Sequence, residues 1–461
     1  MNYILRDLAL SDKFKKYINC LNNTTYPITI SGLAFVSKSQ LIAATYEEKK
    51  KPICVITYNE IQAKQIVKNL SYFLEDIKYF PKKEISAYDY VAESNDIEYE
   101  RIDILNNIYN KNAKIIVTTI EAVMQSMIDK DTLYKNVLSI KLADTLEHTE
   151  LKNKLIQMGY KRVDLIENRG EFSVRGDIVD IGISENEGIR IEFWGDDVDS
   201  IRKFKISSQR STDMLKKIDI YPATENILED QVEKVCKRIE NNKKKYELED
   251  LEIIKEGEYS SKIDKYFNEF YTKQNIFTDY IKDYEIFIDE PEKINQRIIS
   301  IQKENENLIK SLIEKGKSIP EALENINEYK YSMQKVVELK ELDTLKNDFH
   351  TKEVNLFKGD VRNLANGIKE AIRNKKKIVI LAGNNDNAEK IKKALEENVV
   401  IAPNLDNIIL KKGEVIISEG ALSNGFEDTD TKLLVVSSDE FFTKSKKTKK
   451  VSDTFKSGEK I

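Results

Sequence analysis

The chain has 461 residues and a formal net charge of −5, with 40% hydrophobic and 33% charged residues. This balance predicts a globular chain of about three or four domains and excludes a collagen-like or disordered one. No apolar run approaches the roughly 18 residues that span a bilayer, so we expect a cytoplasmic protein without a membrane segment. Three scattered cysteines and two histidines favour neither a disulfide framework, nor a metal site, nor histidine-based catalysis. The acidic balance argues against bulk affinity for nucleic acid.

Residues 1–136 alternate short apolar strands with helical segments. The strands are expected at residues 28–30, 53–56 and 115–119, and helices follow the first two. Strands that alternate with helices predict a parallel sheet in an α/β domain.

A loop between the first strand and helix is similar to a phosphate-binding loop. The pattern G-x-x-x-x-G-K-[ST] holds phosphates with backbone N–H groups and a lysine. Gly32, Lys38 and Ser39 keep that pattern, but Ser37 replaces the second glycine, and Phe35 adds bulk before it. Because a phosphate cradle needs close backbone approach, we predict a degenerate nucleotide site whose loop only begins a helix. Functional ATP binding is the alternative.

Residues 137–226 read as a small antiparallel sheet introduced by a helix. Period-two alternation in residues 172–175 and 189–194 sends apolar side chains to one face, and glycine–aspartate pairs end both runs as turns. The other face carries Ser173, Arg175, Arg190, Glu192 and Trp194. This composition is typical of interface hot spots; a solvated face with cross-strand ion pairs is the alternative.

The remaining sequence predicts a helical segment and then a second α/β unit. Residues 227–256 and 293–345 read as charged, solvated helices with buried stripes. Between them, an apolar strand ends in Asp289-Glu290, as a Walker B motif does, where the aspartate orients magnesium and the glutamate activates water. Without an intact phosphate-binding loop, we expect Asp289 and Glu290 to cap the next helix rather than to catalyse.

Residues 351–446 predict a small α/β domain. Four strands are expected, and the glycine-containing segment 420–426 is expected to be a loop. The lysine-rich residues 444–450 and the chain after them read as a solvated linker. The expected strands occupy residues 378–383, 399–401, 415–417 and 433–436.

The antiparallel segment carries a family resemblance. Arg162, the run GEFSVRGD at residues 170–177 and the run IRIEF at residues 189–193 resemble the UvrA-binding domain of bacterial UvrB. They resemble more closely the UvrB-like module of the transcription-repair coupling factor family, which the turn at 208–211 and the IYP triplet at 220–222 also match. Too few residues separate Tyr90 from the next helix for UvrB's DNA-clamping hairpin, which favours the coupling factor.

This resemblance implies a multidomain α/β fold. A UvrB-like, RecA-like α/β domain with a degenerate P-loop would contain an inserted β-rich UvrA-binding domain, and a small α/β domain would follow. The implied divisions are residues 1–136 for the first α/β domain, 137–226 for the β-rich domain, 227–350 for the rest of the UvrB-like core, 351–446 for the third domain, and 447–461 for a linker towards a missing RNA-polymerase-binding domain.

The resemblance also implies a function and a set of contacts. It makes the chain a UvrA-recruiting fragment of a larger protein. The implied UvrA contacts are Arg162, Arg169, Ser173, Arg175, Arg190 and Glu192, with Ser173 standing where UvrB commonly has another arginine. Losing that bidentate donor is expected to weaken the complex.

The whole family protein is an ATP-dependent DNA translocase that displaces stalled RNA polymerase. Its ATP and magnesium belong to a motor outside this chain, so the chain itself is expected to be no enzyme and to hold no cofactor. RNA polymerase and DNA would bind to missing domains, and a C-terminal domain of the same protein would mask the UvrA surface. The alternatives are a purely autoinhibitory structural module and an active ATPase lobe that uses Lys38 and Asp289.

Overall fold

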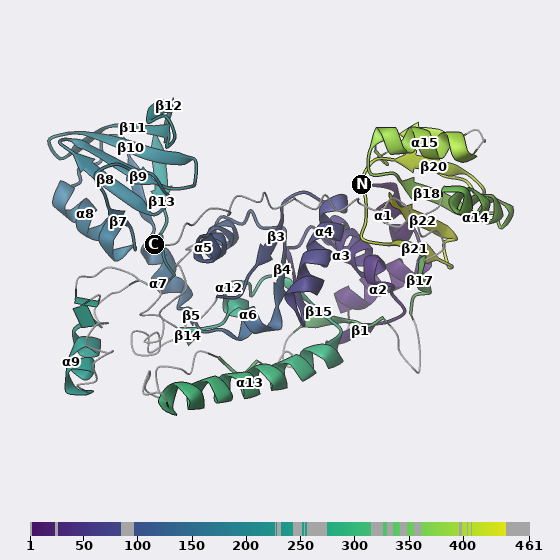
Figure 1. The fold of residues 1–461 in the computed structure, drawn as a ribbon, viewed down its shortest axis with the longest axis horizontal. Coiled ribbons are helices and arrows are strands. Elements are labelled where there is room, and N and C mark those ends of the chain that lie inside the picture. The colour runs from purple at the N-terminus through teal and green to yellow at the C-terminus, as the bar shows by residue number, and fades with distance from the viewer. Residues whose placement is uncertain are drawn as a thin grey trace, which may run out of the picture.

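Three six-stranded sheets organise the described part of the chain. In Figure 1 the antiparallel sheet (teal) and the last sheet (green to yellow) lie at opposite ends of a central parallel sheet. The predicted α/β class, with parallel and antiparallel sheets, is therefore confirmed. The computed structural model describes residues 2–23, 26–83, 96–225, 227, 232–242, 251–252, 254–255, 274–314, 326–329, 335–341, 348–354, 361–395, 399–402, 404–406 and 408–438.

The central sheet is parallel throughout. Its strands, in spatial order, are β1 (Ile28–Ile30), β16 (Val336–Leu339), β15 (Glu285–Asp289), β2 (Ile53–Thr57), β4 (Ile115–Thr119) and β3 (Ile77–Phe80). Every residue of β2, β4 and β15 is buried, as expected for parallel strands covered on both faces. Alternate side chains of β2 enter two different cores, Cys54 and Ile56 on one face, Ile53 and Val55 on the other.

The second sheet is antiparallel except at one edge. Its strands, in order, are β12 (Arg210–Met214), β11 (Asp197–Lys205), β10 (Glu187–Trp194), β9 (Ile178–Gly182), β8 (Glu171–Arg175) and the parallel edge strand β7 (Lys161–Arg162). Ile189 and Ile191 are fully buried and Phe193 is nearly so, which confirms the predicted apolar face. The predicted turns at residues 176–177 and 195–196 are also present, whereas the predicted turn at 208–211 is present only at 208–209, because residues 210 and 211 already belong to β12.

The third sheet is mixed. Its strands, in order, are β17 (Thr351–Val354), β21 (Gly425–Asp428), β22 (Leu433–Ser437), β18 (Lys377–Leu381), β20 (Val415–Ser418) and β19 (Val400–Ala402). Two antiparallel ribbons complete the described strands: β6 (Leu138–Lys141) with β13 (Lys217–Ile220), and β5 (Met127–Ile128) with β14 (Gln274–Asn275).

Helices cover the sheets and connect their strands. They are α1 (Tyr3–Ala9), α2 (Asp12–Asn23), α3 (Phe35–Lys49), α4 (Glu60–Phe73), α5 (Asp96–Tyr109), α6 (Ile120–Met124), α7 (Lys130–Lys135), α8 (His148–Gln157), α9 (Val232–Asn242), α12 (Phe277–Tyr280), α13 (Pro291–Glu314), α14 (Val361–Arg373) and α15 (Asn385–Leu395). None of the described helices is long and apolar enough to cross a membrane.

Two sequence predictions are wrong. Residues 336–339, expected within long helices, form β16, which hydrogen-bonds between β1 and β15. The run VVEL is short and rich in β-branched residues, and pairing on both sides outweighs the helical character of the charged sequence around it.

Gly425 and Phe426, expected in a loop, belong to β21, which pairs with β17 and β22. The expected helix start near residue 320 and the lysine run at 444–450 lie outside the described residues.

A buried ion pair joins α5 to the end of the antiparallel unit. Arg101 donates to both carboxylate oxygens of Glu225, at 3.0 Å from Nη2 to Oε2, and from Nη1 to the Pro81 carbonyl at 2.7 Å. Its guanidinium carbon lies 4.2 Å from the centre of the Phe80 ring. Both charged side chains are almost fully buried, at 1% and 4% exposure. The contact fixes where the chain returns from the antiparallel unit to the central one.

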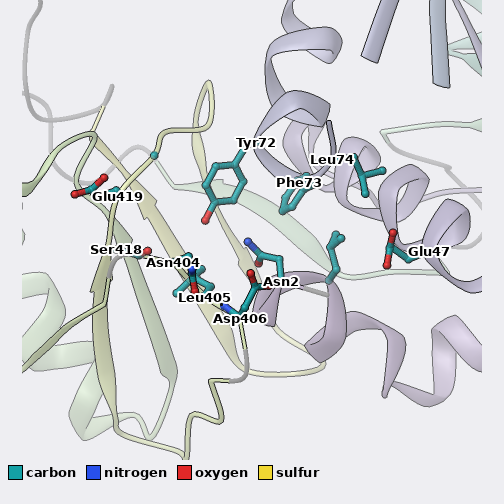
Figure 2. A pocket seen from close by; sticks show the side chains of 12 residues that line it. Asn2, Glu47, Tyr72, Phe73, Leu74, Asn404, Leu405, Asp406, Ser418 and Glu419 are labelled. Carbon is teal, nitrogen blue, oxygen red and sulfur yellow. Dashed lines mark hydrogen bonds between the residues drawn. The ribbon is translucent and has the colours of Figure 1, made fainter. Parts of the chain in front are cut away.

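The third sheet contacts α1 and α4. The Tyr3 N–H donates to the Leu405 carbonyl at 3.0 Å, and Tyr3 and Ile4 lie in the same core as β18 and β20. Gly420, with φ of 96°, lies against Tyr72, and an added Cβ would come within 2.6 Å of that ring. Figure 2 shows the cavity of about 440 Å³ between these elements, with Asn2, Tyr72 and Asp406 facing one another. Glycine is therefore required where the two units meet.

Candidate partner-binding surface

Two rows of side chains cross the outer face of the antiparallel sheet. Strand register aligns residues of β8, β9, β10 and β11, so that side chains in each row are neighbours. The first row is Ser173, Asp180, Arg190 and Arg202; the second is Arg175, Ile178, Glu192 and Ser200. Four of the six predicted contacts, Ser173, Arg175, Arg190 and Glu192, are thereby brought together.

Asp180 is the centre of this face. Its carboxylate accepts hydrogen bonds from Arg190 Nε at 2.7 Å, Arg190 Nη2 at 2.8 Å and Arg175 Nη2 at 2.6 Å. The Arg190 guanidinium also lies 5.0 Å from the centre of the Phe204 ring. Asp180 is 1% exposed, whereas the Arg190 and Arg175 side chains are 17% and 48% exposed. A buried carboxylate therefore fixes two arginines and leaves Arg175 with donors directed at solvent.

Ser173 lies beneath this network rather than on the surface. It is 1% exposed, and its hydroxyl has no hydrogen-bond partner among the described residues. A serine side chain is too short to reach past the flanking arginines. At this position the chain therefore presents no donor to a partner.

Glu192 and Trp194 extend the face along β10. Glu192 accepts a hydrogen bond from the Ser200 hydroxyl at 2.7 Å and pairs with Arg202 at 3.2 Å. Trp194, next to the β10–β11 turn, is 83% exposed. A large aromatic side chain in water beside a fixed set of charges is the composition that binding hot spots share.

Arg162 and Arg169 lie apart from the two rows. Arg162, in the edge strand β7, is in register with the core residue Phe172 rather than with Ser173. Arg169 faces α5, where both terminal nitrogens donate to Asp103 at 2.7 Å and the guanidinium lies 4.7 Å from the Tyr99 ring. Arg169 therefore joins the antiparallel unit to α5.

Sequence reasoning missed Asp180, Arg202 and the exposed Met214. Asp180 carried a signal: it is the one charged residue in the strand IVDIG, at a position that alternation assigns to the outer face. A lone carboxylate opposite two arginines in neighbouring strands predicts a shared ion pair. Which arginines it would pair with depends on register, which the sequence alone does not give.

The Walker-like residues form a separate buried cluster at the carboxyl end of the central sheet. Lys38, 2% exposed, donates to Asp289 Oδ1 at 2.7 Å and to Glu290. Asp289 also accepts from Gln62 at 3.0 Å, and Glu290 from the Glu341 N–H at 2.9 Å. Burial lowers the pKa of the Lys38 ammonium, but the two carboxylates outweigh burial and raise that pKa above its usual value.

The loop before Lys38 is closed by another part of the same chain. Gly32, which follows β1, has a left-handed backbone with φ of 80°, and its carbonyl accepts from the Thr351 N–H at 3.1 Å. The Thr351 hydroxyl accepts from the Ala34 N–H at 2.6 Å, where α3 begins. Ser37 and Ser39 are fully buried, and their hydroxyls have no partner in the described part of the chain. Within that part, no group of three His, Cys, Asp or Glu side chains could hold a metal ion.

Comparison with known proteins finds a family that is similar to the segment forming the antiparallel sheet. Residues 138–226 match the UvrB interaction domain. This segment of the chain is thus similar to the UvrB interaction domain.

Over its whole length the chain is 28% identical to the transcription-repair-coupling factor of Bacillus subtilis and 25% identical to that of Staphylococcus haemolyticus. Over 94% of its length it is 25% identical to the same factor of Staphylococcus aureus. The predicted similarity to transcription-repair coupling factors is confirmed. The chain spans 42%, 42% and 40% of these relatives.

Proposed function

We propose that the chain recruits UvrA as part of a transcription-repair coupling factor in nucleotide excision repair. The outer face of the antiparallel sheet would be the binding surface. The observation that carries this proposal is the Asp180-centred network, which holds Arg175 and Arg190 beside Glu192 and the exposed Trp194 within the matched interaction domain. In the whole protein, a motor beyond this chain would use ATP and magnesium to move on DNA and displace RNA polymerase.

The face is suited to a partner with acidic groups beside an apolar pocket. Because Asp180 already fixes both arginines, little side-chain entropy is lost on binding. Arg175 keeps free donors for a bidentate bond to a partner carboxylate. Glu192 would receive a basic residue, and Trp194 would enter the pocket. Burial of a tryptophan and neutralisation of fixed charges together supply affinity and register.

We infer that the Walker-like cluster is structural. The Lys38 ammonium, which a nucleotide would need for its phosphates, already binds both carboxylates that would serve the metal and the water. The Thr351 hydroxyl occupies one backbone N–H of the loop. These contacts support the expectation that this chain alone is no ATPase and that this loop holds no nucleotide cofactor.

Calorimetry of the purified chain with UvrA of the same organism tests the recruitment. We expect binding, and we expect Arg190→Ala or Glu192→Ala to weaken it by about 1–3 kcal/mol, roughly 5- to 150-fold. Arg373→Ala, which removes an exposed arginine at the end of α14 in the third unit, serves as the matched control and should bind as the parent does. A folded parent that does not bind UvrA contradicts the proposal and favours an autoinhibitory module.

Trp194 gives a separate prediction. Trp194→Ala should weaken UvrA binding by about 2 kcal/mol, while Trp194→Phe should retain most of the affinity because an aromatic ring still fills the pocket. The side chain is exposed in the free chain, so both variants should unfold at the parent's temperature. Ile409→Ala removes another exposed apolar side chain, at 79% exposure, and should change nothing. Equal affinity of the parent and Trp194→Ala would remove this residue from the interface.

A further inference from the structure

A cleft of about 400 Å³ opens on the central unit, and none of its lining residues belongs to the antiparallel sheet. Five tyrosines and four lysines line it, and Asp283 is the one carboxylate among its lining residues in the described structure. Most ligand pockets measure about 300–1,000 Å³ and combine aromatic walls with a few polar groups. Size and composition therefore both fit a small ligand.

The cleft lies at the amino ends of the parallel strands. Pro52 directly precedes β2, Lys114 precedes β4, and Tyr284 precedes β15. Lys38 and Asp289 lie at the opposite, carboxyl ends. The cleft is thus separate from the Walker-like cluster and contains no residue of the matched interaction domain.

Two lysines reach the rim through left-handed backbone turns. Lys50 ends α3 with φ of 51°, and Lys111 follows α5 with φ of 58°. Lys50 pairs with Glu47 at 2.9 Å and Lys114 with Asp76 at 3.6 Å, both on the surface. Lys111 is exposed and has no ion pair among the described residues. The rim is therefore cationic, with Lys111 open to an incoming anion.

The tyrosine rings are held in place by their hydroxyl groups. Tyr134 donates to the Leu105 carbonyl at 2.9 Å, Tyr280 to Ile128 at 2.6 Å, and Tyr284 to Ala113 at 3.0 Å. Burial raises the pKa of all three phenols, so they stay neutral and add no negative charge.

Tyr109 supplies the accessible ring of this wall. Its ring centre lies 4.5 Å from that of Tyr134, with the planes tilted by 38°, and the residue is 48% exposed. Tyr134 in turn meets Tyr280 edge-on at 6.0 Å. The wall thus presents a fixed aromatic surface that ends in one ring open to solvent.

We propose that this cleft binds a nucleotide unit, with the base on Tyr109 and the phosphate at Lys111 and Lys50. A planar ring and an anion on one ligand match an aromatic wall beside lysines, the combination that single-strand-binding grooves use. Such a unit could be a free nucleotide or part of a single strand, and both offer the same chemistry. The chain's net charge of −5 is compatible with this, since the basic rim is local.

Fluorescence anisotropy with a labelled oligothymidylate of about 12 nucleotides, a typical single-strand site size, tests the strand. Calorimetry with thymidine 5′-monophosphate tests the free nucleotide. Tyr109→Ala should weaken binding roughly 5- to 100-fold by loss of stacking, and Tyr109→Phe should not. Lys111→Asn keeps a residue that tolerates the left-handed backbone. Because it removes one contact to a phosphate, the plot of log affinity against log salt concentration should become less steep by about 0.7.

Lys375→Asn is the matched control, because Lys375 also has a left-handed backbone, with φ of 54°, but lies in the third unit after α14. It should bind as the parent does.

Binding of the oligonucleotide alone assigns the site to a strand, and binding of both probes assigns it to the nucleotide itself. No binding of either probe overturns the proposal, as does binding that Tyr109→Ala and Lys111→Asn leave unchanged. UvrA binding should be unaffected by these variants, so the two proposals fail independently.

Discussion

Arg101→Met is expected to cost about 3–5 kcal/mol of unfolding free energy, because it leaves the Glu225 carboxylate buried without its partner. Glu225 is 4% exposed, so its carboxylate has little contact with solvent to compensate for the two hydrogen bonds lost from the guanidinium. The variant also loses the hydrogen bond to Pro81 and the stacking on Phe80. Urea unfolding followed by circular dichroism measures the loss.

Arg169→Met is the matched control for this prediction. Arg169 also makes two hydrogen bonds to one carboxylate and also lies over an aromatic ring, but its partner Asp103 is 54% exposed. Water can solvate Asp103 after the change, so the expected loss is about 1 kcal/mol or less. Equal losses in the two variants would show that burial of the Arg101–Glu225 pair is not what stabilises the joint.

The Arg101→Met variant should also change how stability depends on pH. Burial raises the pKa of Glu225, but Arg101 outweighs burial and holds that pKa below its usual value. A lowered folded-state pKa gives stability that is present above the unfolded pKa and is lost as pH falls through the folded pKa. Without Arg101, burial raises the pKa of Glu225 and only the weaker attraction of the Lys83 charge opposes it. The stability gap between parent and variant should therefore shrink as pH falls from neutrality to below about 4.

Lys38→Met is expected to destabilise the chain by a similar amount, about 3–5 kcal/mol, because it leaves Asp289 buried and charged. Asp289 has no exposed surface, and among the described residues its carboxylate would keep only the hydrogen bond from Gln62. Lys38→Met combined with Asp289→Asn should recover part of the loss, since the second change removes the buried charge. Thermal and urea unfolding of the three proteins measure both effects.

Nucleotide supplies the contrasting test of the same cluster. If the cluster is structural, magnesium and ATP should leave the unfolding temperature unchanged in a protein whose tyrosine cleft is disabled by Tyr109→Ala and Lys111→Asn. A working nucleotide site at Lys38 would behave in the opposite way: ATP would stabilise that protein through linkage, and adding Lys38→Met would abolish the response at little cost in stability. That second pattern would overturn the structural interpretation of Lys38.

Local sequence patterns predicted strands with a regular apolar period better than strands that depend on pairing with distant parts of the chain. The alternation in residues 189–194 and the apolar runs of β2 and β4 predicted strands that the structure contains, because burial imposes a period on each segment alone. Residues 336–339 were missed because four apolar-rich residues within a charged segment give no period to measure. Their strand character comes from pairing with β1 and β15, which are distant in sequence.

The site shows the same division between local and distant information. Alternation alone placed Arg190, Glu192 and Trp194 on one face. That Arg169 faces α5 instead follows from Asp103, 66 residues earlier in the chain, and no pattern around Arg169 reveals it. Asp180 as the shared acceptor of two arginines likewise depends on the register between β8, β9 and β10.

Residues 349–354 link the central sheet to the third sheet, so we expect the two sheets to unfold together on heating. Phe349 is buried in a core of the central sheet, the Thr351 hydroxyl accepts from the Ala34 N–H just before α3, and Val354 is buried in a core of the third sheet. A short segment that completes both structures couples their melting, so calorimetry should record one cooperative transition for the two sheets. It also restricts recombination between relatives: a crossover at residue 350 would place Thr351 and its hydrogen-bond partners Gly32 and Ala34 on segments from different parents. A recombinant that folds would need to take residues 349–354 and the loop at Gly32 from the same parent.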